Sequence, residues 1–87
     1  MINFKQRELS QMLFNKLKNQ FPELELVGFS EGPEDPSDIL VNVIMPEDED
    51  REVEVRGMAG EISSDILMDY GYVILASASP KDEKIVV

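Results

Sequence analysis

Acidic side chains gather in a short segment that follows a glycine and a serine, Gly28 and Ser30. The eight residues after that serine contain four carboxylates: Glu31, Glu34, Asp35 and Asp38. Carboxylates at this density can bind a hard divalent cation such as Mg²⁺, which takes oxygen ligands. Their spacing matches no EF-hand loop, however, and the glycine and prolines between them are typical of a turn. We therefore favour a solvated turn over a metal site.

Two residue types that dominate enzyme sites are absent, because the sequence contains neither histidine nor cysteine. A histidine general base, a catalytic triad, a thiolate metal site and a disulfide scaffold are therefore excluded. The sequence also lacks the glycine-rich P-loop pattern and the Gly-x-Ser-x-Gly pattern of serine hydrolases. We interpret Ser77 and Ser79, which lie in an apolar segment, as packing or solvent-facing residues and not as nucleophiles.

The charge of the chain is strongly negative and unevenly distributed. The net charge of the 87 residues is −10, but residues 1–20 carry +3 and residues 21–87 carry −13. A negative domain repels the phosphate backbone, so we expect no nucleic-acid partner. The acidic part favours solubility and would attract a basic protein, although a solvated surface is the simpler interpretation of it.

The sequence shows no membrane or export signal. Its first residues contain no long apolar stretch of the kind found in signal peptides, and no apolar run approaches the roughly 18 residues that span a bilayer. We therefore expect one cytoplasmic domain over residues 1–87 that does not contact a membrane.

An amphipathic helix is predicted from about residue 3 to residue 20. Its apolar residues recur every three or four positions: Leu9, Met12, Leu13, Leu17 and Phe21. Pro22 ends the helix, because the residue before a proline is pushed out of the helical conformation. The next segment, 24–30, alternates as a strand does, which would put Leu26 and Gly28 on one side.

A second strand is predicted over residues 38–45, after the turn. Both of its sides are apolar, which is typical of a central strand that is covered on two faces. The acidic run 47–50 then fits the start of a helix, where the helix dipole favours carboxylates. The apolar side of that helix contains Val55, Met58, Ala59, Ile62, Ile66 and Leu67. Gly57 and Gly60 would mark close contacts with the sheet, and Gly71 fits the helix end.

A third strand is predicted over residues 72–79 and ends before Pro80. Beyond it, the chain from Ile85 forms either a tail or a short edge strand. The predicted fold is thus a single small α/β (α+β) domain of order α-β-β-α-β. Its three-stranded sheet is mixed, because a hairpin joins the first two strands and a helical crossover joins the second to the third. Both helices pack on the sheet, and four methionines are expected in the core: Met12, Met45, Met58 and Met68.

The stretch from Gly28 into the second strand resembles the nucleotidyltransferase superfamily, in particular its small stand-alone members. In that family a Gly-Ser pair after the first strand holds nucleotide phosphates, and an Asp-x-Asp at the second strand holds Mg²⁺. The resemblance implies a nucleotide-binding role for Gly28 and Ser30 and a metal-binding role for Asp38. Residues 51–83 are similar to the family's second helix, its Tyr-Gly exit and its following strand.

Several residues depart from that family pattern. Phe29 interrupts the Gly-Ser pair, Leu40 occupies the place of the second aspartate, and residues 72–79 contain no carboxylate. Two-metal phosphoryl transfer needs several convergent carboxylates, which a single Asp38 cannot supply. The resemblance therefore implies a degenerate member with no catalytic residue, in which Asp38 is vestigial and no cofactor is expected.

Our preferred hypothesis is a catalytically inactive domain that acts by protein–protein contact, as antitoxin-like nucleotidyltransferases do with helical partners. The expected partner is a basic, helical protein or a second copy of the chain. In a first alternative, a weakly active nucleotidyltransferase binds ATP and Mg²⁺, with Glu31, Glu34 and Asp35 as replacement ligands beside Asp38. In a second, an unrelated α+β interaction module forms a homodimer through an edge strand, because a small three-stranded sheet leaves unpaired edges.

Overall fold

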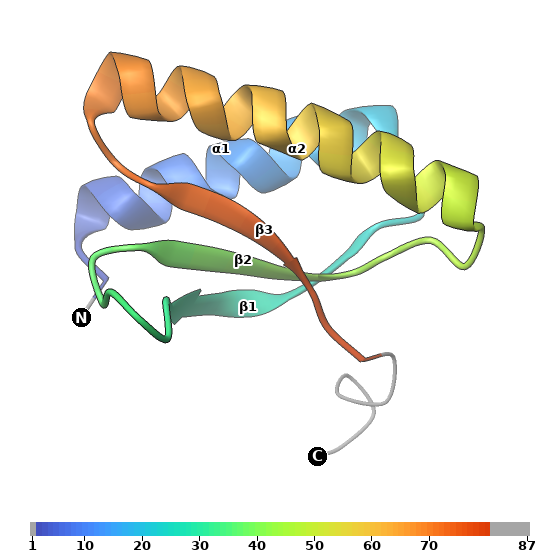
Figure 1. The fold of residues 1–87 in the computed structure, drawn as a ribbon, viewed down its shortest axis with the longest axis horizontal. Coiled ribbons are helices and arrows are strands. Elements are labelled where there is room, and N and C mark those ends of the chain that lie inside the picture. Colours follow the sequence, from blue (N-terminus) through green and yellow to red (C-terminus); the bar gives the residue numbers. More distant parts are fainter. Residues whose placement is uncertain (1, 81–87) are drawn as a thin grey trace.

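The computed structural model describes residues 2–80, which form two helices and a three-stranded sheet (Figure 1). In chain order the elements are α1 (Phe4–Gln20), β1 (Glu25–Glu31), β2 (Ile39–Ile44), α2 (Glu49–Tyr70) and β3 (Ile74–Ala78). The predicted α-β-β-α-β order is confirmed. The chain from Ile85, for which we expect a tail or an edge strand, lies outside the described residues.

β2 lies at the centre of the sheet, as predicted. It pairs with β1 in an antiparallel and with β3 in a parallel arrangement, so the sheet is mixed. Both helices cover the same face, and we call the other one the open face (Figure 1). Ile39, Val41 and Val43 of β2 are fully buried in the core between the helices and the sheet. The prediction that β2 is covered on both faces is wrong at Leu40 and Asn42, which are half-buried on the open face.

β1 contains an irregularity that changes which residues face the helices. Its register with β2 shifts between Leu26 and Gly28, so Leu26 lies opposite Val43 whereas Gly28 lies opposite Asn42. Because Val43 faces the core and Asn42 the open face, Leu26 and Gly28 lie on opposite faces of the sheet. The predicted alternation, which puts them on one side, is wrong because a β-bulge inserts one residue and reverses the sides of those that follow.

α1 begins with a reciprocal cap. The Asn3 side chain accepts a hydrogen bond from the Gln6 N–H at 2.8 Å, and the Gln6 side chain accepts one from the Asn3 N–H at 2.9 Å. Gln6 also donates through Nε2 to the Ser37 carbonyl at 3.2 Å, which ties the helix to the loop between β1 and β2. Phe14 and three leucines at helical spacing are buried: Leu9, Leu13 and Leu17. This apolar side packs on all three strands.

α2 begins after the Asp48 cap and ends, as predicted, at Gly71. The Asp48 carboxylate accepts a hydrogen bond from the Asp50 N–H at 2.9 Å, and Gly71 has a φ of 77°, which glycine adopts without strain. The helix packs mainly on β3 and against α1. Neither Gly57 nor Gly60 marks a close contact that requires glycine, contrary to prediction. Both are exposed, and a Cβ added to either would meet no atom within 4 Å.

The four methionines predicted in the core do not share one environment. Met12, Met45 and Met58 are half-buried and pack against the core, as predicted. Met68 is 83% exposed, so its prediction as a core residue is wrong. Leu67, which the pattern places on the apolar side of the helix, is 48% exposed. Two adjacent apolar residues in the last turn of α2 therefore remain at the surface.

Candidate functional site

The predicted metal and nucleotide residues lie in and beside the loop that joins β1 to β2. In this loop the Asp35 carboxylate accepts hydrogen bonds from the Ser37 N–H at 3.0 Å and from the Ser37 hydroxyl at 2.8 Å. These bonds lower the pKa of Asp35 below its ordinary value, first through the main-chain N–H and then through the hydroxyl. The Gly32 N–H donates to the Asp38 carbonyl at 2.7 Å and the Asp38 N–H to the Asp35 carbonyl at 3.0 Å, which closes a compact turn.

The carboxylates of this loop do not converge on one point. Within residues 2–80, no group of three or more acidic side chains is placed so that it could hold a metal ion. Glu31, Glu34 and Asp35 are exposed and Asp38 is half-buried. What these residues form is a turn that needs glycine at position 32, because a Cβ there would lie 2.9 Å from the Asp35 carbonyl oxygen.

Gly28 and Ser30 lie on the open face of β1, next to a polar side chain that no motif marks. Asn42 of β2 donates a hydrogen bond from Nδ2 to the Ser30 hydroxyl at 3.0 Å. Strand pairing places Gly28, Asn42 and Ser77 in one row across the sheet, with Leu40 opposite Ser30 in the next. The signal for Asn42 in the sequence is one amide inside an apolar strand. This group is neutral, so it offers hydrogen bonds but no negative charge for a metal ion.

Most exposed apolar side chains of the described part lie on α2. Of the six large hydrophobic residues that are exposed within residues 2–80, four belong to this helix: Val53, Leu67, Met68 and Tyr70. Val53 is 69% and Met68 83% exposed, so water contacts most of their surface. Single exposed residues of this kind are common, but Val53, Leu67 and Met68 together form a candidate contact surface, whereas the Tyr70 ring lies beside Lys5 of α1.

Carboxylates lie beside these residues on the outer side of α2. They recur at intervals of four, seven and four residues, which places them along one exposed side that we call the acidic row: Asp50, Glu54, Glu61 and Asp65. An adjacent line recurs at intervals of four and three residues, and we call it the seam: Val53, Gly57, Gly60, Ser64 and Leu67. The outer side of α2 therefore combines a line of small and apolar residues with a row of negative charge.

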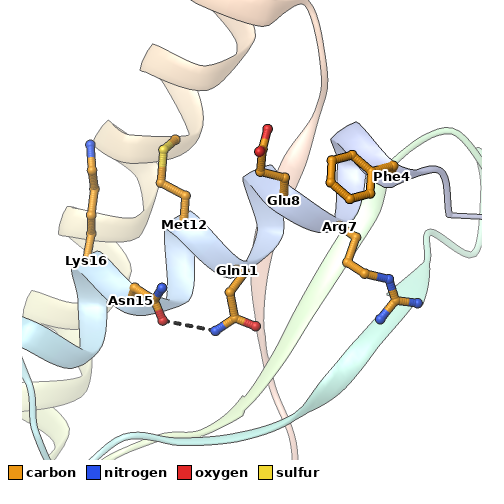
Figure 2. Close-up of a pocket in the computed structure, with 7 residues that line it drawn as sticks. All are labelled: Phe4, Arg7, Glu8, Gln11, Met12, Asn15 and Lys16. Carbon is orange, nitrogen blue, oxygen red and sulfur yellow. Dashed lines mark hydrogen bonds between the residues drawn. The ribbon is translucent and has the colours of Figure 1, made fainter.

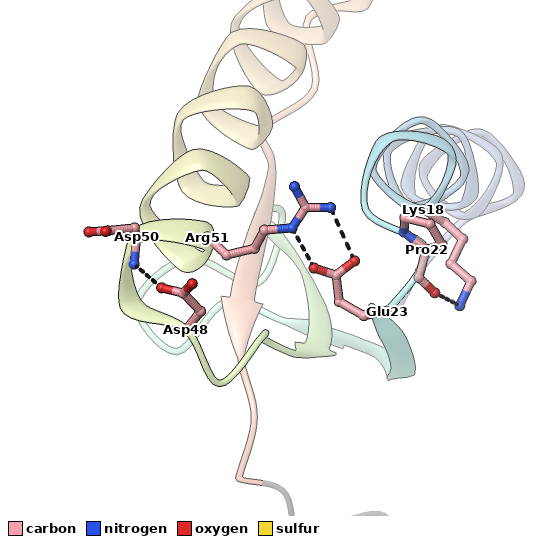
Figure 3. Close-up of polar contacts among 6 residues, drawn as sticks. All are labelled: Lys18, Pro22, Glu23, Asp48, Asp50 and Arg51. Atoms are coloured by element: carbon pink, nitrogen blue, oxygen red, sulfur yellow. Dashed lines mark hydrogen bonds and ion pairs between the residues drawn. The ribbon is translucent and has the colours of Figure 1, made fainter.

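The two arginines of α2 pair with carboxylates outside the acidic row. Arg51 donates to the Glu23 carboxylate through Nε at 2.6 Å (Figure 3). The Arg51 guanidinium also lies 4.7 Å from the centre of the Phe21 ring. The hydrogen bond between Arg51 and Glu23 lowers the pKa of Glu23 and raises the pKa of Arg51. Arg56 pairs with Glu52, one turn earlier, at 2.8 Å. Neither ion pair includes a member of the acidic row.

A broad hollow of about 540 Å³ follows the exposed side of α1 (Figure 2). Seven residues line it, all from this one helix: Phe4, Arg7, Glu8, Gln11, Met12, Asn15 and Lys16. In Figure 2 these side chains spread away from the helix and do not converge on a common point. Because a small-molecule site encloses most of its ligand, a hollow lined by a single helix is a poor candidate for such a site.

Comparisons with known proteins add no family to this description. None of the protein-family models, curated proteins or solved structures compared with the chain matches it. Within residues 2–80, no helix has both the length and the apolar character needed to cross a membrane. We therefore choose the candidate site from the structure alone. It is a contact surface on the outer side of α2, made of the acidic row and the exposed apolar residues.

Proposed function

We propose that the chain is a protein-interaction domain, and that the outer side of α2 binds a basic helical segment of another protein. One observation carries this proposal: exposed apolar residues and the acidic row lie side by side on the same helix. A basic amphipathic helix could cover Val53 and Leu67 with its apolar side and bring lysines or arginines to Glu54 and Glu61. Burial of apolar area would provide affinity, while the opposite charges would speed association and select the partner.

The small residues of the seam favour a helix as the occupant. Gly57, Gly60 and Ser64 lie between Val53 and Leu67, and the space that a Cβ of either glycine would fill is open. A partner helix can therefore approach the α2 backbone closely, with its own side chains filling the gap. The intervals of four and three residues also match the spacing of contacts along two packed helices.

The proposal extends to the fold family. We assign the domain to a nucleotidyltransferase-like architecture that has lost transferase activity. The order of elements and the mixed sheet support this assignment. Leu40 and the absence of a carboxylate from residues 72–79 support the loss of activity, because in the family pattern these places supply carboxylates to Mg²⁺. An antitoxin-like role, in which the domain covers a helical segment of its partner, agrees with the docking surface.

A matched pair of photo-crosslinking variants tests the surface. A photoreactive amino acid replaces Met68 in one variant and Phe4 in the other, because these side chains are 83% and 82% exposed on different helices. In cells that produce the protein naturally, position 68 should crosslink to a protein segment with lysine or arginine along one side of a helical pattern. Position 4 should not give this product. Identical products from both positions, or none from position 68, would contradict the proposal.

The crosslinked segment, made as a peptide, then tests the charges. Its association rate should fall as salt is added, because the screening length is only about 8 Å at physiological ionic strength. Replacement of Glu54 and Glu61 by lysine should slow association further and leave dissociation nearly unchanged. If the association rate does not respond to salt, the acidic row does not attract the partner and serves only to keep the protein soluble. A titration with ATP and Mg²⁺ tests the enzyme alternative, which saturable binding of both would favour.

A further inference from the structure

The outer edge of β3 carries main-chain groups with which no strand pairs among residues 2–80. The Ile39 N–H donates to the Val73 carbonyl at 3.0 Å, and the Ser79 N–H donates to the Val43 carbonyl at 2.8 Å. Val73 and Ser79 therefore direct these groups toward β2. Because main-chain groups alternate sides along a strand, those that face away from β2 belong to three alternate residues: Ile74, Ala76 and Ala78.

This edge lacks the features that protect most sheet edges. From residue 72 to residue 79 the sequence contains no charge and no proline, and the register of β3 with β2 has no bulge. The opposite edge differs, because β1 begins at Glu25, ends at Glu31 and contains the register shift next to Gly28. Charges and bulges discourage further strand pairing. β1 is therefore a protected edge and β3 an open one.

The space beside the β3 edge is lined mainly by small and apolar residues. Two hollows of about 230 and 240 Å³ lie between α2 and β3 and share Gly60, Ser63 and Leu75. Neither is lined by a carboxylate, although the chain has a net charge of −10. Arg56 lines one hollow, and its charge is compensated by Glu52. Two copies of this negatively charged chain can therefore meet here across uncharged residues.

We propose that β3 pairs with β3 of a second copy of the chain, antiparallel and about a two-fold axis at Ala76. In this register Ala76 lies opposite the same residue of the second copy and Ile74 lies opposite Ala78. Every outward N–H and C=O of the three residues then has a partner. The two copies share one continuous sheet, with three strands from each. Because Gly60 and Ser63 are small, the two α2 helices have room to approach each other across the axis.

A second copy fits this edge better than a basic helical partner does. The edge offers main-chain groups that another strand can pair with and a helix cannot, and residues 72–79 carry no charge that would attract a basic partner. The edge is separate from the acidic row, but the hollows beside it share Gly60, Ser64 and Leu67 with the seam, so a second copy and a helical partner would compete for this part of α2. Added salt separates the two interactions, because screening weakens attraction to a basic partner but relieves repulsion between two chains of charge −10.

Sedimentation equilibrium of the full chain over a range of protein and salt concentrations tests this pairing. We expect a species of twice the 9.8 kDa chain mass, with a population that increases with salt. Ala76→Pro should abolish this species, because the lost N–H points away from β2 and the internal hydrogen bonds remain. Gly60→Glu should abolish it too, since it adds bulk and charge beside the edge at a position where an added Cβ meets no atom within 4 Å. Far-UV circular dichroism confirms that each variant is folded.

Gly57→Glu is the matched control for the dimer. It is the same substitution on the same helix, but Gly57 lines neither hollow beside β3. The dimer should therefore persist in this variant, whereas binding of a helical partner to the seam should weaken. A dimer that survives both Ala76→Pro and Gly60→Glu would overturn the proposal, because its interface would then lie elsewhere.

Amide hydrogen exchange identifies what covers the edge. Protection of the Ala76 and Ala78 amides that increases with protein concentration supports the pairing of two copies. A chain that stays monomeric at every concentration overturns it. In that case, protected amides would assign the edge to residues 81–87 of the same chain, and rapidly exchanging amides would show an edge open to water.

Discussion

The two helices lie on the same face of the sheet, yet they differ in how they join the rest of the molecule (Figure 1). α1 packs on all three strands, whereas α2 packs mainly on β3 and against α1. Leu9, Leu13 and Leu17 of α1 are at most 1% exposed, whereas α2 leaves Val53 and Met68 largely in water. The comparison indicates that α1 holds the core together and that α2 uses one side for the core and presents the other.

The charges of the two helices differ in the same direction. α2 carries seven carboxylates against two arginines, and both arginines are in ion pairs. α1 carries four basic residues against one carboxylate, Glu8. The helices meet where the Lys5 ammonium lies 4.7 Å from the centre of the Tyr70 ring. α2, with excess negative charge and exposed apolar residues, is suited to bind another protein. α1, which packs on three strands, is suited to stabilise the fold.

A leucine-to-alanine substitution on each helix should give the largest difference in the free energy of unfolding. Leu13→Ala should lower the free energy of unfolding by about 2–5 kcal/mol, because it leaves a cavity at a fully buried site. Leu67→Ala on α2 should change it by less than about 1 kcal/mol, since that side chain is 48% exposed. Urea denaturation measures both. Equal losses would mean that Leu67 is buried like Leu13, and that the side of α2 on which it lies is not an open surface.

Substitutions at the N-termini of the two helices should change the free energy of unfolding by smaller amounts. Gln6→Ala removes the two hydrogen bonds of the Gln6 side chain, one from the Asn3 N–H and one to the Ser37 carbonyl, and keeps the bond from the main-chain N–H of residue 6 to Asn3. We expect a loss of about 1–3 kcal/mol because these groups are partly buried. Asp48→Ala removes one exposed cap of α2 and should cost about 0.5–2 kcal/mol. Thermal unfolding of the two variants compares them. A larger loss for Asp48→Ala would contradict the central role of α1.

A substitution in the seam should raise stability instead of lowering it. Gly57→Ala improves the helix propensity of α2 by about 0.5–1 kcal/mol, and the added methyl group meets no atom within 4 Å. The melting temperature should therefore rise slightly. If the melting temperature falls, Gly57 is in contact with another part of the protein, and the seam is not an open surface.

The smallest expected effect concerns the ion pair that joins α2 to the segment after α1. Arg51 lowers the pKa of Glu23 below its ordinary value of 4.5, so the pair stabilises the fold above that pH, and the contribution is lost as pH falls through the lowered pKa. Both groups are exposed, so the effect is small. Glu23→Gln should be slightly less stable than the unmodified protein at neutral pH and equally stable in acid. Denaturation at a series of pH values measures this difference, and a difference that is constant with pH would contradict it.

The order of the elements could be predicted from the sequence because it depends on local features. Pro22 follows the end of α1, and Gly71 ends α2 with a φ that other residues rarely adopt. β2 could be placed at the centre because Ile39, Val41 and Val43 are apolar and their neighbours Leu40 and Ile44 are apolar too.

The candidate site was much harder to predict. The density of carboxylates draws attention to the loop near Asp35, where the glycine and prolines favour a turn, and the structure has a turn there. Val53 and Met68 carry no motif, and their exposure depends on which side of α2 faces the sheet. A helical pattern gives the spacing of the apolar residues. Because several sides of α2 contain apolar residues, this spacing alone does not show which side faces the sheet.

The sequence by itself determined where the helices and strands lie, because backbone preferences and apolar period act within a few residues. The tertiary structure alone decided which sides those elements present. The bulge between Leu26 and Gly28 reversed the faces of β1, and α1 occupied the space over all three strands. α2 is thereby left over β3, with its acidic row outward. The physical reason is that the exposure of a side chain depends on which elements cover the sheet. The two helices compete for one face of a small sheet, and the outcome depends on residues far apart in the sequence.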